Sequence, residues 1–187
     1  MKKLDLKNLN SRIIRACKLD ETLYEDIRGD KNALSQATLV VVLSSFAAGI
    51  GSISLIWKVG TIAAIIIGTL AALLGWCFWI LIIYFVGMKI FAKPYSVSTL
   101  DFWQFAQFSG FAASAGLIRV LGSVAFVGTF VSFLSGIWLI AAMSVAIKKI
   151  FELDIRKSVF VCIISWLIEF IIIAVAVSLF INIKGAK

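Results

Sequence analysis

The chain has 187 residues, of which 61% are hydrophobic and only 15% charged, and it carries a net charge of +8. A soluble domain of this size needs far more polar surface, so the composition predicts a polytopic integral membrane protein with a single membrane domain. Histidine is absent and the three cysteines lie far apart, which excludes the usual metal ligand sets and the commonest general base, so we expect neither a metal nor another cofactor.

Residues 1–33 form a polar segment that carries eight of the 18 lysines and arginines. Basic residues beside a first membrane span mark the cytoplasmic side and attract lipid head groups, so we expect contact with membrane lipids and no nucleic acid. Apolar residues recur at helical spacing, which predicts a short amphipathic helix. Its apolar face lies either on the membrane surface or on the protein's own cytoplasmic face. In the first case four basic residues bind the membrane surface: Lys7, Arg12, Arg15 and Lys18.

Five apolar segments follow, and each is expected to be a membrane-spanning helix. Together they form a transmembrane domain over residues 34–187. The predicted fold class is therefore all-α: a polytopic membrane helical bundle of about five spans, preceded by the short amphipathic helix. The expected spans are about 34–57, 60–88, 102–122, 123–147 and 158–181.

Small residues recur four apart in three of these segments. Because membrane helices associate by close packing, such stripes predict helix contacts inside the bundle, and they are also compatible with a homo-oligomer. The stripes are Ser44, Ala48 and Ser52 in the first span, Gly60, Ala64, Gly68 and Ala72 in the second, and Gly128, Ser132 and Gly136 in the fourth.

The basic residues also predict the orientation of the spans. With five spans and a cytoplasmic N-terminus, 14 of the 18 lysines and arginines lie on the cytoplasmic side. This distribution follows the rule that basic loops stay inside, so we expect the C-terminus to lie outside.

Glu169 lies at the centre of the fifth span, where an ionisable side chain costs on the order of 3 kcal/mol on insertion scales. It shares a helix face with Cys162 and Ser165, so we expect it to point into the bundle. Two interpretations stay open. One is a proton, cation or polar-substrate site, and the other is a protonated carboxyl group hydrogen-bonded to a neighbouring helix.

Three further polar residues lie in the third span, which is the least hydrophobic. Arg119 is near its outer end and differs from Glu169 by roughly 9 Å in depth at 1.5 Å per residue, so snorkelling or phosphate binding is expected rather than a salt bridge. Gln104 and Gln107 are near its cytoplasmic end, where interhelical hydrogen bonds are favoured over a substrate site.

No catalytic set is recognisable, because the chain has no Ser-His-Asp material, no Walker loop, no metal cluster and no pair of acids at a useful spacing. We therefore do not expect an enzyme.

Two stretches together resemble the bacterial branch of the Yip family, the Ypt/Rab-interacting membrane proteins. They are Leu19-Asp20 with Leu23-Tyr24-Glu25-Asp26-Ile27, Asp30 and Gln36-Ala37 leading into VVVLSSFAAGIG (40–51), and GFAASAGLIRVLG (110–122) with Ile137-Trp138-Leu139, Ala141-Ala142 and the 161–166 segment. The resemblance implies about five spans, a cytoplasmic N-terminal region and, for a bacterial member, the cytoplasmic (inner) membrane. Eukaryotic relatives are associated with Golgi and endoplasmic reticulum membranes, Rab-type GTPases and vesicle traffic.

Two functions are compatible with this sequence. The leading hypothesis is a non-enzymatic membrane protein that organises membrane or protein partners, docking at its cytoplasmic face through the basic tail and the charged residues 148–157. The alternative is a transporter of a small solute or lipid, similar to a scramblase, with a path near Glu169.

Overall fold

The computed structural model describes residues 6–54, 60–91, 101–124 and 127–185, and within these ranges the chain is helical and contains no strand. This confirms the predicted all-α membrane bundle. The helices are α1 (Leu6–Cys17), α2 (Thr22–Ile27), α3 (Ala33–Gly51) with the 3₁₀ turn η1 (Ser52–Ser54), α4 (Thr61–Val86) with the π turn η3 (Gly87–Phe91), α6 (Phe102–Ala112), the 3₁₀ helix η4 (Ala113–Ser123), α7 (Gly128–Phe151) and α8 (Ile155–Gly185).

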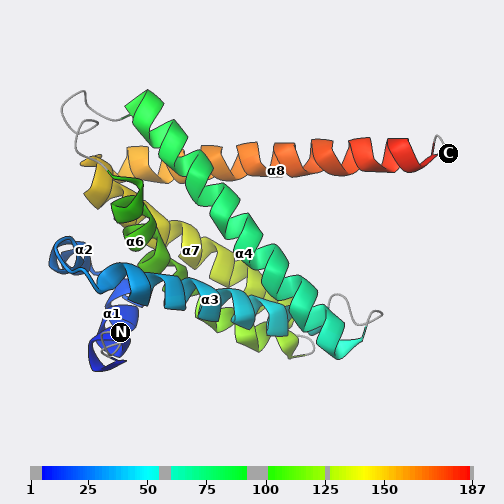
Figure 1. Ribbon diagram of the computed structural model, residues 1–187, viewed down its shortest axis with the longest axis horizontal. Helices are drawn as coiled ribbons and strands as arrows, with labels where there is room; N and C mark the ends of the chain where they lie inside the picture. Colours follow the sequence, from blue (N-terminus) through cyan, green and yellow to red (C-terminus); the bar gives the residue numbers. More distant parts are fainter. Residues whose placement is uncertain (1–5, 55–59, 92–100, 125–126, 186–187) are drawn as a thin grey trace.

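Four helices of the described chain are long and apolar enough to cross a bilayer: Ala33–Gly51, Thr61–Lys89, Gly128–Phe151 and Ile155–Val175. The third expected span is a composite of α6 and η4, with 11 residues in each. At the rises of α and 3₁₀ helices these reach roughly 38 Å, which exceeds the roughly 30 Å hydrocarbon core. Figure 1 shows this composite running beside α3 and α7. It ends at Ser123, and α7 begins at Gly128.

Small residues let the helices approach closely where the sequence predicts stripes. At the α3–α4 contact, an added Cβ at Gly68 would lie 3.0 Å from the Cα atom of Gly49 and would collide with the Ser52 hydroxyl. At the α3–η4 contact, an added Cβ at Gly51 would collide with the carbonyl oxygen of Arg119. Gly136 differs, because nothing lies within 4 Å of its added Cβ. The predicted homo-oligomer stays a prediction.

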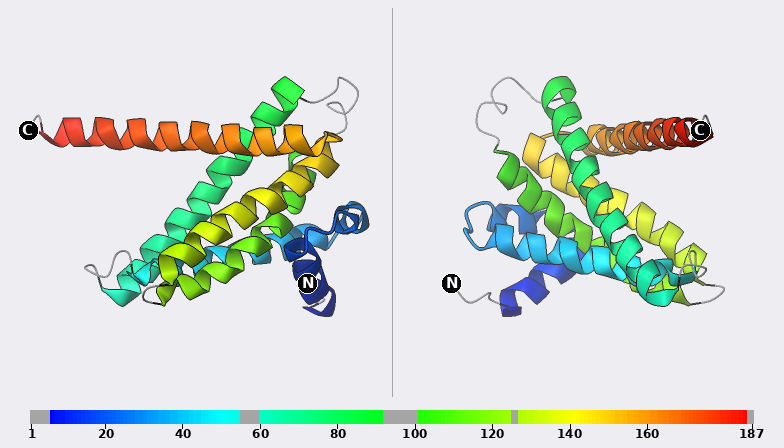
Figure 2. Two further views of the ribbon diagram at one scale, coloured as in Figure 1. Left: turned by 180° about the vertical axis from the view of Figure 1, so that it is seen from behind. Right: turned by 45° about the vertical axis from the view of Figure 1, so that its right-hand side comes forward.

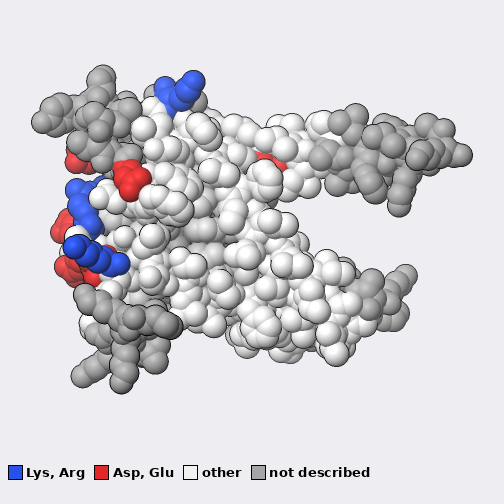
Figure 3. All heavy atoms as spheres, in the orientation of Figure 1, with Lys and Arg blue, Asp and Glu red and all other residues white. Residues whose placement is uncertain are grey.

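An aromatic core joins α2 to the bundle at one end. The ring of Tyr24 lies 5.2 Å from that of Phe108, and the ring of Phe105 lies 5.6 Å from Tyr84 and 5.9 Å from Phe151. Figure 3 shows that Lys, Arg, Asp and Glu side chains gather at this end, which we call the charged end, while the length of the bundle is largely uncharged. The charged end consists of α1, α2 and the end of α7.

The last helix leaves the bundle at an angle. The first half of α8 packs against α7 and α4, and its continuation extends away from the other helices (Figures 1 and 2). Phe170 is 63% exposed, as expected of a side chain that faces lipid. Where α8 diverges, its residue Glu169 faces the interior of the bundle.

Candidate functional site

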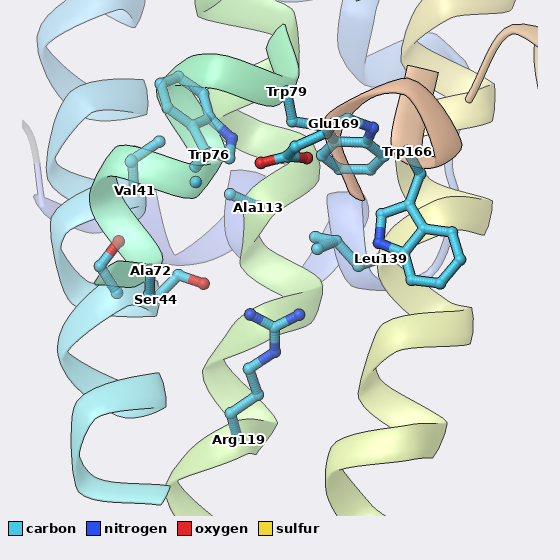
Figure 4. Close-up of a pocket in the computed structure, with 12 residues that line it drawn as sticks. Val41, Ser44, Ala72, Trp76, Trp79, Ala113, Arg119, Leu139, Trp166 and Glu169 are labelled. Atoms are coloured by element: carbon cyan, nitrogen blue, oxygen red, sulfur yellow. The ribbon is translucent and has the colours of Figure 1, made fainter. Parts of the chain in front are cut away.

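The 3₁₀ winding of η4 turns Arg119 toward the interior of the bundle. Side chains three residues apart lie above one another in a 3₁₀ helix, so Arg119 shares a row with Ala113, Gly116 and Gly122. The other three members of this row are buried and Arg119 is half-buried. The row faces α3, since an added Cβ at Gly116 would collide with the Ser44 hydroxyl. Figure 4 shows the Arg119 guanidinium extending into the bundle.

Glu169 approaches the same region from α8. Its carboxylate lies over Gly75 of α4, where an added Cβ would stand 3.6 Å from the Glu169 Oε1 atom. Figure 4 shows this carboxylate among the indole rings of Trp76, Trp79 and Trp166. The sequence correctly indicates that Glu169 points inward, and the missing side chain at Gly75 leaves room for its carboxyl group.

A cavity of about 220 Å³ lies between these two charged groups. Arg119 and Glu169 form no ion pair within 4.0 Å, and neither side chain makes a hydrogen bond to another residue of the described chain. The absence of a salt bridge agrees with the expectation from the sequence, whereas the guanidinium points into the cavity and not toward the outer interface. The lining residues with polar side-chain atoms are Ser44, Ser45, Trp76, Trp79, Arg119, Trp166 and Glu169.

Two of the cavity residues carry buried donors without partners. The indole nitrogens of Trp76 and Trp79 are inaccessible and have no hydrogen-bond partner. An indole N–H can only donate, so each of these groups needs an acceptor. Two other cavities, of about 450 and 410 Å³, are larger but have no charged residue in their walls. Of these three cavities, the smallest is therefore the one with charged residues in its wall.

The two glutamines of the third span have different surroundings. Gln107 is buried, and its Nε2 atom donates to the carbonyl oxygen of Ile27 at 2.6 Å, which ties α6 to the end of α2. This is the interhelical hydrogen bond that the sequence favours. Gln104 is exposed at the side of α6. Neither glutamine lines the cavity between Arg119 and Glu169.

The basic residues of α1 are largely engaged within the protein. Arg12 pairs with Asp30 at 2.7 Å, and Arg15 pairs with Asp20 at 2.7 Å and Asp26 at 2.6 Å. The apolar side of α1 is buried, with Leu9 and Ala16 5% and 1% exposed, and it packs against α6 and η4. The sequence leaves two placements open, the membrane surface or the protein itself. In the structure the apolar side of α1 lies on the protein, against α6 and η4.

The other two basic residues that the sequence predicts to bind the membrane surface are Lys7 and Lys18. Lys18 follows α1 and is exposed. Lys7 lies in α1, and its side chain is outside the described residues. Binding of lipid head groups by Lys7, Arg12, Arg15 and Lys18 stays a prediction, and for the two arginines it would compete with the ion pairs of α1.

Further ion pairs fasten α2 to α7. Lys149 pairs with Glu25 at 2.8 Å and Glu21 at 3.5 Å, and Lys148 also pairs with Glu21. The hydrogen bond from Lys148 is the main cause that lowers the pKa of Glu21. The hydrogen bond from the Thr22 hydroxyl, followed by that from Arg15, lowers the pKa of Asp20 to about 2. The carboxylates of the charged end are thus stabilised in their ionised form.

Sequence reasoning identified the two charged groups of the cavity but not its uncharged ones. In the sequence, Gly75, Trp76 and Trp79 are simply members of the apolar segment 60–88. A signal was present, because Ala72, Gly75, Trp76 and Trp79 recur at spacings of three and four and lie on one side of a helix. Among the described residues, no group of three or more His, Cys, Asp and Glu side chains is placed to hold a metal ion.

The family model of the Yip1 domain matches residues 22–177 of this chain. The matched region begins with α2, ends within α8 and contains both Arg119 and Glu169. No curated protein and no solved structure matches the chain.

Proposed function

The chain belongs to the Yip family, and on that premise we propose that it is a non-enzymatic integral membrane protein that organises the bilayer by binding lipid head groups between Arg119 and Glu169. One observation carries the proposal: two side chains of opposite charge border a single cavity at membrane depth without pairing. Charged groups in this position are costly unless a polar partner satisfies them. Residues that bear such a cost inside a membrane commonly serve a ligand.

The position of the cavity favours a ligand that comes from the membrane over one that comes from water. Trp166 lines the cavity and is also 50% exposed on the outer surface of α8. Glu169 and Arg119 are only half-buried. The surface around Trp166 belongs to an apolar helix that faces hydrocarbon, so a lipid can present its head group to the cavity from the side.

The depth of the site indicates what binding would accomplish. Glu169 lies within Ile155–Val175, the part of α8 that is long and apolar enough to cross a hydrocarbon core. A head group bound there has left its own interface. We propose that a head group bound there leaves toward either side, so that lipid moves between the leaflets.

Reconstituted vesicles test this function. Purified protein is inserted into vesicles that contain a lipid with a fluorescent head group, and dithionite is added outside to quench the accessible label. We expect the wild-type protein to expose inner-leaflet label faster than protein-free vesicles, and we expect Glu169→Gln and Arg119→Gln to slow this exchange. Gly136→Ala, outside the cavity, is the matched control and should behave as the wild type. Quenching no faster than in protein-free vesicles would refute lipid movement.

A second candidate function is that of an adaptor, and the charged end favours it. The ion pairs of Lys149 and Arg15 hold α2 in a fixed position, while Glu25 and Asp26 keep 63% and 59% of their side chains exposed. A preformed surface of this kind suits a protein partner. A photo-crosslinking residue at Lys31, which is exposed beside α2, should then capture one discrete protein in native membranes. The same residue at lipid-facing Phe133 should not.

We also propose an orientation in the membrane: the charged end lies in the cytoplasm of a bacterial cell, and the C-terminus lies outside the inner membrane. The basic character of residues 1–33 and 148–157 supports this placement. A Lys31→Cys variant should react with an impermeant thiol reagent only after the cells are permeabilised. Labelling of this variant in intact cells would show that the charged end lies outside and would refute the proposed orientation.

A further inference from the structure

We infer that the cavity selects zwitterionic head groups, with a phosphodiester beside Arg119 and an ammonium group beside Glu169. This inference rests on the proposed function, and it names the class of lipid that the site takes. It states the charges that the ligand carries and which end of the ligand lies beside each of the two residues.

The two charged groups enter the cavity from different sides. Figure 4 shows the Arg119 guanidinium at one end and the Glu169 carboxylate at the other, with the cavity between them. They form no ion pair within 4.0 Å, and both residues line the cavity. The fold thus holds a positive and a negative group apart and leaves room between them.

A ligand with charge of only one sign cannot satisfy this arrangement. An anionic head group would pair with Arg119 but would bring negative charge toward Glu169 in a medium of low dielectric constant. A cation would pair with Glu169 and meet the same difficulty at Arg119. A zwitterion neutralises both groups, and its own dipole fixes its direction. Selection against singly charged lipids therefore follows from repulsion as well as from attraction.

The uncharged groups of the cavity agree with this ligand. Ser44 and Ser45 line the cavity, and a serine hydroxyl can donate to the oxygens of a phosphodiester. The indole rings around Glu169 also favour a cation, since an ammonium group is attracted to the faces of tryptophan. Phosphate oxygens and an ammonium group thus find partners beyond the two charged residues.

The size of the cavity indicates which part of the lipid enters. At about 220 Å³ it is smaller than the 300–1,000 Å³ that is typical of drug-sized ligands. It therefore accommodates a head group and leaves the acyl chains in the surrounding hydrocarbon. The same chemistry exists in a soluble head-group compound such as glycerophosphoethanolamine, and the experiment has to distinguish this source from the lipid.

Lipid retention measured by native mass spectrometry tests the inference. The full chain is reconstituted into bilayers of equal parts phosphatidylethanolamine, which is zwitterionic, and phosphatidylglycerol, which is anionic, and is then released with its bound lipids. We expect the wild-type protein to retain phosphatidylethanolamine at least fivefold over phosphatidylglycerol. Glu169→Gln should remove this preference by binding phosphatidylglycerol better, and Arg119→Gln should reduce retention of both lipids.

Conservative variants keep the test decisive if a neutral variant does not fold. Arg119→Lys and Glu169→Asp preserve the charges and should preserve the preference, as should Gly136→Ala, which lies outside the cavity. Displacement of the bound lipid by glycerophosphoethanolamine at concentrations that leave the membrane intact would assign the site to a soluble ligand and overturn the lipid assignment.

The remaining outcomes separate this inference from the proposed function. Equal retention of both lipids by a wild-type protein that still moves lipid between leaflets would refute charge selection and leave lipid movement standing. A wild-type protein that retains no lipid and moves none would refute both. A preference for phosphatidylethanolamine that survives Glu169→Gln would refute the assigned position of the ammonium group.

Discussion

Replacing Gly49 by alanine tests the close packing of α3 on α4, the two helices that supply one wall of the cavity. An added Cβ at Gly49 would lie 2.6 Å from the carbonyl oxygen of Ile65 and 2.9 Å from the amide nitrogen of Thr69. Both are backbone atoms of α4, so relief requires a shift of a whole helix. Overpacking of this kind costs about 1–3 kcal/mol, while alanine gains up to about 1 kcal/mol over glycine in helix propensity.

Gly136→Ala isolates the propensity part of this effect. It makes the same chemical change in a membrane helix, but nothing lies within 4 Å of the added Cβ. The free energy of unfolding of Gly49→Ala should therefore fall about 1–3 kcal/mol below that of Gly136→Ala, roughly 5- to 150-fold in the equilibrium constant. Reversible unfolding of both variants in mixed micelles with increasing dodecyl sulfate measures this difference. Equal stability of the two variants would show that the α3–α4 contact is not as close as described.

Three further predictions concern the charged end. Arg12→Ala removes the 2.7 Å ion pair with Asp30 and the 2.6 Å hydrogen bond to the Gln36 Oε1 atom, and α1 should then exchange its amide hydrogens at least fivefold faster, corresponding to about 1 kcal/mol or more, while Lys18→Ala leaves this rate unchanged. Because the pKa of Asp20 is lowered to about 2 from 3.8, its contribution to stability is complete above roughly pH 4 and is lost as the pH falls toward 2; thermal unfolding of Asp20→Asn should lack this part of the pH dependence. Trp138→Phe removes a 3.0 Å hydrogen bond to the last carbonyl of α1 from a side chain that is 44% exposed, so the thermal midpoint should fall by no more than a few degrees, about 1 kcal/mol.

The apolar spans could be predicted from the sequence because their cause is local. A run of about 20 apolar residues is sufficient for a membrane helix, and α3, α4, α7 and α8 follow this rule. The placement of α1 depends on a distant surface. Its apolar periodicity is the same whether it covers lipid or protein, so periodicity alone could not decide. The acids at Asp20, Asp26 and Asp30 were the available signal, since they offer partners to Arg12 and Arg15 within one short segment.

The cavity could be predicted only in part, because its geometry depends on how η4 is wound and how α8 is inclined. The sequence estimate of a difference in depth of roughly 9 Å between Arg119 and Glu169 assumes upright α-helices at 1.5 Å per residue. In the structure the chain changes to 3₁₀ winding at Ala113, and α8 crosses the bundle obliquely. With 3.6 residues per turn, Ala113 and Gly122 would lie on opposite sides of the helix. With three residues per turn, the row from Ala113 through Arg119 to Gly122 stays aligned and faces α3. The same winding that lets Gly116 and Gly122 pack closely therefore turns a positive charge away from the interface and toward a carboxylate.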